Sequence, residues 1–383
     1  MRFSLRDIVT FATVALLAMF IAATLLVVAA GGYSSLSSPR SSSAPHPPAA
    51  LWSVDTEEKV LAVSTAGDLV FVSTSQSARA LNLNTGEEIW RFPRYTGQNI
   101  APLLCGGIVV FPKLDSSLMA FDAQKGYLLW QNTMPHDDTS SRIVSMACGQ
   151  NILVVVRRFG PVVAYSLATG KEIWRYPLSL RASVDIAIDS SVVYVPAIYQ
   201  GVFAINIKNG NLIHHFAIRD AYKAKVIDHR VCVAVGQRKN VYVVVLSEAG
   251  KVLGEIPLGD ETDVDTISIH QHSILFSTGK SVASVSFPQG HTHWIYESIE
   301  GRVRHAPQTT DGLVFFRDAY NLYILQESNG MLQEKIPLGN GRWQDFFLLS
   351  YPVPVVAKQS RNSCIIVSSQ NWVKCYPVFS SAP

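Results

Sequence analysis

Seven copies of one short phrase, spaced about 40 residues apart, constrain the fold of this chain more than any other feature of its sequence. Each copy has an apolar segment, two or three polar residues that end in glycine, and a second apolar segment, as in ALNLNTGEEIW starting at Ala80. The glycines are Gly86, Gly126, Gly170, Gly210, Gly250, Gly290 and Gly330. Five of the six intervals between them are 40 residues, which predicts a repeated structural unit.

Each phrase is typical of a β-hairpin, because glycine supplies the positive φ that the loop needs. A further apolar run precedes each phrase, as at Ile152–Val156, and a weaker strand such as Ile186–Ile188 precedes that run. The unit is therefore four antiparallel strands in about 40 residues, which is the strand number and length typical of a β-propeller blade.

The two ends of the chain carry the parts of one more unit. Cys364–Ser368 and Trp372–Tyr376 match the second and third strands of a repeat, and Leu51–Val54 matches a fourth strand. Joining them closes the ring and leaves no exposed sheet edge. Residues 50–383 then divide into eight blades of about 42 residues. We predict an all-β, eight-bladed β-propeller of four-stranded antiparallel blades, closed by N- and C-terminal strands that share one blade.

The pattern A-x-[DNS]-x-x-[TN]-G-x-x-x-W resembles the repeats of pyrroloquinoline-quinone (PQQ)-type propellers, which include quinoprotein dehydrogenases and BamB-like scaffolds. The resemblance covers residues 51–383. It implies that the fourth-strand tryptophans dock between adjacent blades and are structural; these are Trp52, Trp90, Trp130, Trp174 and Trp294. His214, Gly254 and Glu334 replace tryptophan in the other copies, so docking there is left open.

The resemblance also raises the question of quinone chemistry. Enzymes of that family hold calcium or a lanthanide through clustered carboxylate and amide ligands, and often stack the quinone on a disulfide between neighbouring cysteines. This sequence has no adjacent cysteine pair, and its densest acidic run, residues 260–265, has no partner cluster. It also has no GxSxG, P-loop or HExxH motif. We therefore expect no cofactor and no catalytic residue, and hence a non-enzymatic protein. The alternative is an enzyme or sensor that binds a quinone, a metal or a sugar in the propeller funnel.

Two residue sets are candidates for more specific chemistry. His270, His272, His291 and His293 fall in one repeat and are weak candidates for zinc or copper, the alternative being unrelated exposed histidines. Cys364 and Cys375 flank Ser369–Gln370; if those two residues form the turn, the cysteines lie opposite each other and form a candidate disulfide, with two reduced thiols as the alternative. Cys105 and Cys148 occupy equivalent positions in successive blades, which we expect to be too far apart to bond.

Loop composition indicates which face could bind a partner. Arginines and aromatic residues, which dominate protein interfaces, gather in the turns between second and third strands and in the connections between blades. The candidates are Arg94, Tyr95, Arg157, Arg158, Phe159, Arg342 and Trp343. The alternative is an ordinary polar rim. We expect a protein partner, and no nucleic acid, since the net charge is only +3.

The N-terminal residues are predicted to attach the propeller to a membrane. Residues 8–30 are 23 residues without a charge, long enough to span a bilayer. Arg2 and Arg6 precede them, so residues 1–7 are expected in the cytoplasm and the propeller outside it. Residues 31–49 are a Ser/Pro-rich linker, and residues 50–383 are the propeller. The alternative is a signal peptide cleaved near Ala30, which would release a secreted protein.

Overall fold

The computed structural model describes residues 50–132, 142–178, 185–237, 239–303, 305–310, 312–337, 355–358 and 363–377. The chain divides into two units, Met1–His46 and Pro47–Pro383, and all described residues belong to the second. Among these residues, no helix is long and apolar enough to cross a membrane. The predicted anchor and linker lie outside the described residues and remain predictions.

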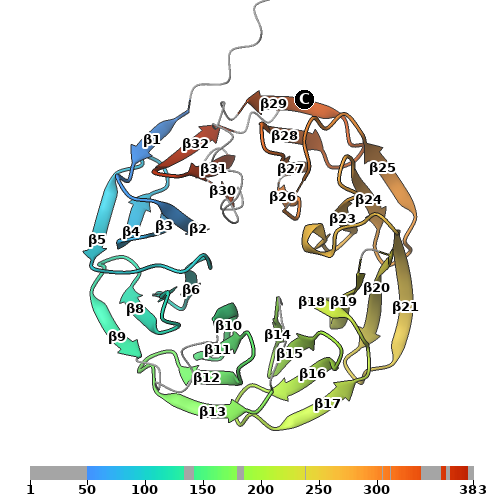
Figure 1. Ribbon diagram of the computed structural model, residues 1–383, viewed down its shortest axis with the longest axis horizontal. Coiled ribbons are helices and arrows are strands. Elements are labelled where there is room, and N and C mark those ends of the chain that lie inside the picture. Colours follow the sequence, from blue (N-terminus) through green and yellow to red (C-terminus); the bar gives the residue numbers. More distant parts are fainter. Residues whose placement is uncertain are drawn as a thin grey trace, which may run out of the picture. The chain divides into compact units, whose positions relative to one another are not determined.

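The strands of Pro47–Pro383 form eight four-stranded sheets that stand side by side around a common centre (Figure 1). Seven of these sheets use four consecutive strands, and we number them blades 1 to 7. The remaining sheet has the order β1-β32-β31-β30, and we call it the closing sheet. The prediction of an all-β propeller with four-stranded antiparallel blades is confirmed.

The strands of the first four blades lie in sequence order. Blade 1 has β2 (Val60–Ala66), β3 (Leu69–Thr74), β4 (Ser77–Asn82) and β5 (Glu88–Pro93). Blade 2 has β6 (Leu103–Cys105), β7 (Ile108–Pro112), β8 (Leu118–Asp122) and β9 (Leu128–Asn132). Blade 3 has β10 (Ile143–Gly149), β11 (Ile152–Arg157), β12 (Val162–Ser166) and β13 (Glu172–Tyr176). Blade 4 has β14 (Ala187–Asp189), β15 (Val192–Ala197), β16 (Gly201–Asn206) and β17 (Leu212–Phe216).

The later blades follow the same plan. Blade 5 has β18 (Ala221–Ile227), β19 (Arg230–Gln237), β20 (Lys239–Ser247) and β21 (Val252–Gly259), and a short 3-10 helix, η2 (Val264–Thr266), follows it. Blade 6 has β22 (Ser268–Ile269), β23 (Ser273–Ser277), β24 (Val282–Ser286) and β25 (Thr292–Tyr296). Blade 7 has β26 (Gln308–Thr310), β27 (Leu313–Arg317), β28 (Asn321–Gln326) and β29 (Leu332–Pro337). The closing sheet has β30 (Val355–Lys358), β31 (Ser363–Ser369), β32 (Trp372–Pro377) and β1 (Trp52–Asp55).

The closing sheet joins the two ends of the propeller. β1 pairs antiparallel with β32, so that Trp52 lies opposite Cys375 and Asp55 lies opposite Trp372. β30 lies beside β2 of blade 1 and β26 of blade 7. The expected pairing of the first strand with the last is therefore present.

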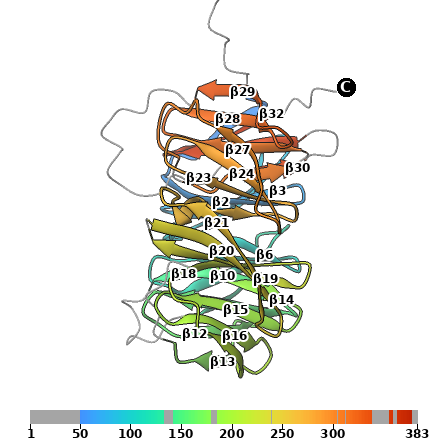
Figure 2. The same ribbon diagram turned by 90° about the vertical axis from the view of Figure 1, so that its right-hand side faces the viewer.

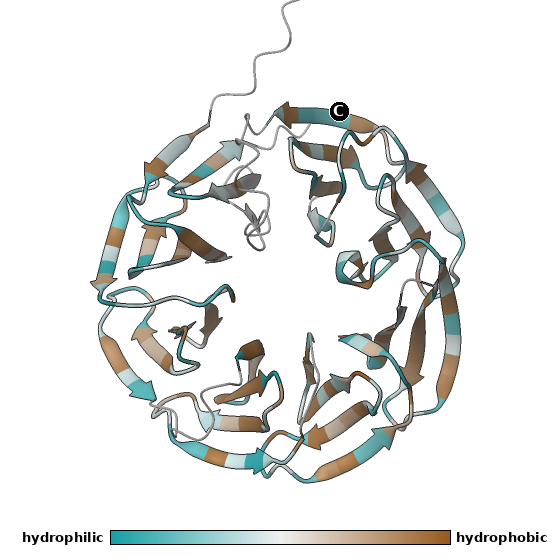
Figure 3. Ribbon diagram, in the orientation of Figure 1, coloured by the Kyte–Doolittle hydropathy of each residue, from teal (hydrophilic) through white to brown (hydrophobic). Residues whose placement is uncertain are grey.

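Burial follows the radial order of the strands. The first strand of each blade lies nearest the centre and the fourth lies outermost (Figure 1), and Figure 2 shows the same ring edge-on. All six residues of β3 are buried, whereas Trp90 is the only buried residue of β5. The outermost strands contain both hydrophobic and hydrophilic residues (Figure 3). The core lies between successive sheets, because each sheet packs its apolar side chains against its neighbours.

The hairpin at the C-terminus has a different register from the one we expected. β31 ends at Ser369 and β32 begins at Trp372, so the turn is Gln370–Asn371. Cys375 therefore lies opposite Ile366, and Cys364 lies opposite Pro377. The two cysteines are diagonal rather than directly opposed. The side chain of Cys364 lies outside the described part, so the Cys364–Cys375 disulfide remains a prediction.

Candidate functional site

The repeated phrase builds the contact between neighbouring blades. On five fourth strands, the tryptophan indole N–H donates a hydrogen bond to a backbone carbonyl in the hairpin turn of the next blade. The donor–acceptor pairs are Trp52 and Leu83 at 2.8 Å, Trp90 and Ala123 at 2.9 Å, Trp130 and Leu167 at 2.8 Å, Trp174 and Ile207 at 2.7 Å, and Trp294 and Glu327 at 2.7 Å. These tryptophans are 7% to 8% exposed, so they belong to the packing between blades.

In five of the phrases the glycine lies directly under the indole of the preceding sheet. A Cβ built on Gly86 would lie 2.7 Å from Cδ2 of Trp52, and one on Gly170 would lie 2.5 Å from Cε3 of Trp130. Gly126, Gly210 and Gly330 meet a tryptophan in the same way. We predicted these glycines from the turn alone, but they also make room for the docking ring.

Two of the blades without a fourth-strand tryptophan fill the contact with a different side chain. Phe216, two residues after His214 on β17, covers Gly250 of blade 5. Ile256, two residues after Gly254 on β21, lies 3.0 Å from the Cβ position of Gly290. A residue two positions along a strand points to the same side. The replacement is therefore visible in the sequence, and we missed it by looking only at the tryptophan position.

Burial removes two residues from the candidate partner face. Tyr95 is 0% exposed, and its hydroxyl lies 3.0 Å from the Ser73 hydroxyl and donates to the Pro112 carbonyl at 2.6 Å. Burial also raises the pKa of Tyr95 well above its ordinary value. Arg157 is 0% exposed, with one guanidinium N–H donating to the Tyr165 hydroxyl at 3.0 Å. Both are structural residues, because a fully buried side chain cannot contact a partner.

The remaining candidates that the structure describes, Arg94, Arg158 and Phe159, lie on one side of the ring. We call the loop face the side that carries the turns between second and third strands and the connections between blades. Arg94 and Arg158 are exposed there, and the Arg158 guanidinium carbon lies 5.3 Å from the centre of the Phe159 ring. Arg342 and Trp343 lie outside the described residues and remain predictions.

Exposed apolar side chains recur on the loop face at equivalent turns. Leu114 of blade 2, Phe159 of blade 3 and Tyr199 of blade 4 are 56%, 55% and 55% exposed. Tyr320 of blade 7 occupies the same turn and is 39% exposed. Three successive blades therefore present a large apolar side chain at the same place. Leu114 was missed because its turn carries no arginine, although its position between β7 and β8 marks it in the sequence.

The four candidate histidines do not assemble into a metal site. His270 is largely buried, with its ring nitrogens 2.7 Å from the Ser268 hydroxyl and 3.2 Å from the Thr309 hydroxyl. Burial, with a smaller effect of the Lys225 charge, lowers the pKa of His270 to about 4. His272, His291 and His293 are exposed. Across the described ranges, the one group of three close metal-ligating side chains contains none of these four.

The expectation that Cys105 and Cys148 lie too far apart to bond is wrong. They form a disulfide with a Cα–Cα distance of 6.3 Å, which joins β6 of blade 2 to β10 of blade 3. These are first strands, close to the centre of the ring, where equivalent positions of neighbouring blades converge. Sequence period alone does not show that the spacing between blades decreases towards the centre.

Solved structures similar to this chain include a BamB, Sqt1 and a quinohemoprotein alcohol dehydrogenase. BamB from Moraxella catarrhalis is 13% identical, with a TM-score of 0.65, covering 88% of this chain and 98% of that one. Sqt1 from Saccharomyces cerevisiae is 12% identical, with a TM-score of 0.65, covering 88% and 100%. The quinohemoprotein alcohol dehydrogenase ADHIIG from Pseudomonas putida HK5 is 13% identical, with a TM-score of 0.63, covering 88% and 77%. At such identities the likeness extends to the fold alone.

Sequence comparison with curated proteins gives no significant match. One family model does match, at residues 46–147 and 137–333, which together make up most of the chain. That model is described as outer membrane protein assembly factor BamB, a PQQ-type repeat family, in agreement with the resemblance of the repeats. The chain therefore belongs to the family of outer membrane protein assembly factor BamB.

Proposed function

We propose that this protein is a non-catalytic scaffold that binds a protein partner outside the cytoplasm through its loop face. The observation that carries the proposal is the row of exposed apolar side chains at equivalent turns of blades 2 to 4, namely Leu114, Phe159 and Tyr199. Aromatic residues flanked by arginine are typical of the energetically dominant positions of protein interfaces. Arg158 beside Phe159 and the exposed Arg94 fit that composition.

Membrane attachment and export are part of the same proposal. The uncharged segment 8–30, preceded by two arginines, would hold the propeller on the far side of a membrane, with the linker 31–49 as a tether. The disulfide between Cys105 and Cys148 supports this placement, because disulfides persist in oxidising compartments. Membership in the BamB family supports a scaffold that works beside a membrane.

Site-specific photo-crosslinking tests the proposed surface. A photoreactive phenylalanine analogue would replace Phe159 or Tyr199 in the full chain, expressed in its native cells. The matched control is Tyr127, which is 67% exposed but lies in the turn after β8, on the opposite side of the ring. We expect a discrete protein adduct from positions 159 and 199 and none from position 127.

Substitution provides the second arm of the test. The triple variant Leu114→Ser, Phe159→Ser, Tyr199→Ser leaves no place for the photoreactive residue, so it is tested by affinity copurification of the partner that crosslinking identifies. Recovery of that partner should fall at least about tenfold, since a truncated anchor residue costs on the order of 2 kcal/mol. The variant Leu129→Ser, Ile213→Ser, Leu253→Ser removes three exposed apolar side chains from the outermost strands and should not reduce recovery. Equal recovery with both variants would refute the proposal.

A further inference from the structure

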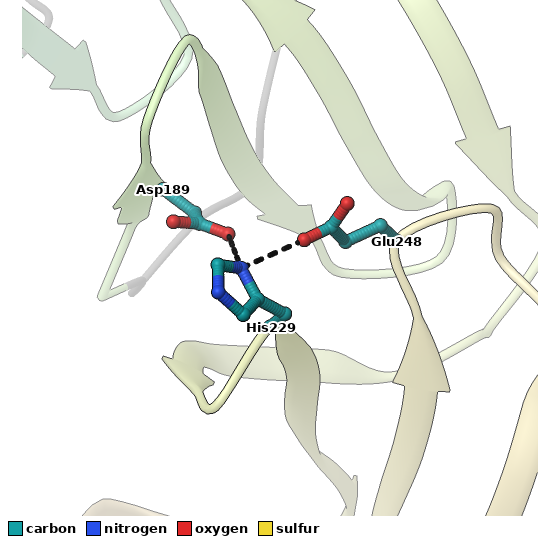
Figure 4. A group of neighbouring side chains, drawn as sticks. All are labelled: Asp189, His229 and Glu248. Atoms are coloured by element: carbon teal, nitrogen blue, oxygen red, sulfur yellow. Dashed lines mark ion pairs between the residues drawn. The ribbon is translucent and has the colours of Figure 1, made fainter.

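Three side chains that can bind a metal ion come together between blades 4 and 5, on the side of the ring opposite the loop face. Asp189 ends β14, His229 directly precedes β19, and Glu248 lies in the turn after β20. One ligand atom of each residue lies within 4.8 Å of the other two. Figure 4 shows the imidazole between the two carboxylates. Asp189 comes from the end of a strand, and His229 and Glu248 come from two separate turns, so the sequence gives no local motif for the group.

The spacing of the ligand atoms suits a small divalent ion. His229 Nδ1 lies 3.0 Å from Glu248 Oε1 and 3.6 Å from Asp189 Oδ2. Bonds of about 2.0–2.2 Å at a tetrahedral angle place two ligand atoms about 3.4 Å apart. The observed distances lie on either side of that value, and His229 and Glu248 are exposed, so their side chains are free of packing that would prevent a small rotation towards an ion.

The side chain of His229 does not pack against the protein core, although its turn has an unfavourable backbone conformation. Asp228 and His229 both have positive φ, 46° and 59°, where blade 2 has Gly106 and Gly107 in the equivalent turn. A histidine in this conformation costs more than glycine would. Its side chain is 77% exposed, so burial does not repay that cost. The imidazole is presented to solvent beside two carboxylates.

The local charge favours a cation. Burial raises the pKa of Tyr194 on β15, and the charges of Asp189 and Glu248 raise it further. Both carboxylates therefore act on the same small region, where His229 is the third member of the group.

We propose that Asp189, His229 and Glu248 bind one divalent transition-metal ion, of the type of Zn²⁺, which links blade 4 to blade 5. One imidazole nitrogen with two carboxylate oxygens is a ligand set that zinc accepts, whereas magnesium and calcium prefer oxygen ligands alone. The ion takes the place of a proton on Nδ1, and three protein ligands leave a fourth position for water. The competing arrangement is an ion pair between protonated His229 and the carboxylates.

Calorimetric titration of the metal-stripped full chain with ZnCl₂ tests the site. The protein is purified in mild detergent without a histidine tag. We expect His229→Ala to weaken the tightest binding event about tenfold or more. The matched control is His272→Ala: His272 is also exposed and directly precedes the second strand of its blade, but Pro288 stands at the position equivalent to Glu248. Binding that is unchanged in His229→Ala, or lost equally in both variants, would overturn the proposal.

A stability measurement provides an independent readout. An ion that binds only the folded protein raises its unfolding temperature. Zn²⁺ should therefore raise the unfolding temperature of the wild type and of His272→Ala, but not that of Asp189→Asn or Glu248→Gln. In EDTA all four proteins should unfold at closely similar temperatures, because these side chains lie at the surface. A wild type that gains no stability from Zn²⁺ would show that the group is an ion pair only.

Discussion

Gly170 illustrates how a single residue of the repeat serves two purposes, one in its hairpin turn and one in the contact with Trp130 of the preceding blade. The glycine has a φ of +67°, which the hairpin turn requires, and its Cα lies against the indole of the preceding blade. The same turn offers the Leu167 carbonyl to the indole N–H. Turn geometry and blade docking therefore depend on the same position, and this explains why tryptophan and glycine recur together in the repeat.

We predict that Gly170→Ala destabilises the propeller more than Gly67→Ala does. Gly67 also has a positive φ, +56°, but an added Cβ there would meet nothing within 4 Å. Gly67→Ala should therefore cost only the backbone strain, on the order of 1 kcal/mol. Gly170→Ala should cost at least about 1 kcal/mol more, because Trp130 must move and lose its hydrogen bond. Denaturant midpoints of the two variants measure the difference; equal midpoints would show that the indole contact contributes nothing.

At the scale of elements, the connection from β1 to β2 is anchored by a buried ionic group. Glu58 accepts a hydrogen bond from the Ser77 hydroxyl at 2.6 Å and lies 3.0 Å from the Arg79 guanidinium. Arg79 also donates to the Thr56 carbonyl at 2.6 Å, and Arg91 pairs with Glu58. This group connects β1, the outermost strand of the closing sheet, to blade 1. It therefore stabilises the point at which the ring is joined.

Acid should weaken this connection. Burial raises the pKa of Glu58, but hydrogen bonds from Ser77 and Thr74 and the charge of Arg79 outweigh it, so the pKa lies below its ordinary value. The stabilisation is therefore complete above about pH 4.5, the value in the unfolded chain, and is lost as the pH falls through the folded pKa. Glu58→Gln should cost on the order of 2 kcal/mol at pH 7, because the buried Arg79 then keeps only the Glu88 carboxylate, 3.1 Å away, as an ion-pair partner. That cost should shrink below about pH 4.

Unfolding midpoints measured from pH 3 to pH 7 test this prediction. The matched control is Glu57→Gln, because Glu57 is the exposed neighbour in the same connection. Its midpoints should follow those of the wild type at every pH. A Glu58→Gln variant whose deficit is the same at pH 3 and pH 7 would contradict the assignment of the carboxylate as the stabilising form.

The sequence predicts elements better than it predicts side-chain burial. The hairpins and their glycines follow from the 40-residue period, since turn chemistry and alternation are local properties. Tyr95 and Arg157 were expected at the surface because they belong to polar segments, but each is drawn inward by partners on other strands. The Glu58–Arg79 pair and the Asp189–His229–Glu248 group each join residues from separate strands and loops, so no spacing along the chain indicates them.

At the scale of the molecule, the radial arrangement decides which equivalent positions meet. Cys105 and Cys148 are in contact because both lie on first strands, close to the centre of the ring. The same separation along the chain on the outermost strands would leave a wide gap. The period of the repeat predicts that the blades follow one another around the ring. The distance between equivalent positions of neighbouring blades depends on how far those positions lie from the centre, and the period gives no information about that.

We predict that the protein from its native cells carries the Cys105–Cys148 disulfide. Digestion without reduction, followed by mass spectrometry, should yield the linked peptide pair. The bond closes a loop with a sequence separation of 43, which in the chain-entropy model contributes about 4 kcal/mol. The double variant Cys105→Ser, Cys148→Ser should therefore unfold at a clearly lower temperature than the wild type.

Cys232→Ser is the control for this experiment, because it separates loss of the cross-link from loss of a buried thiol. Cys232 is 0% exposed, and burial raises its pKa to about 12, so its thiol stays protonated and inert. Substituting it should cost only local packing, with no change in the linked peptides. Since glutathione keeps cytosolic thiols reduced, a native protein with Cys105 and Cys148 both alkylated before reduction would contradict the disulfide and remove the support it gives to export.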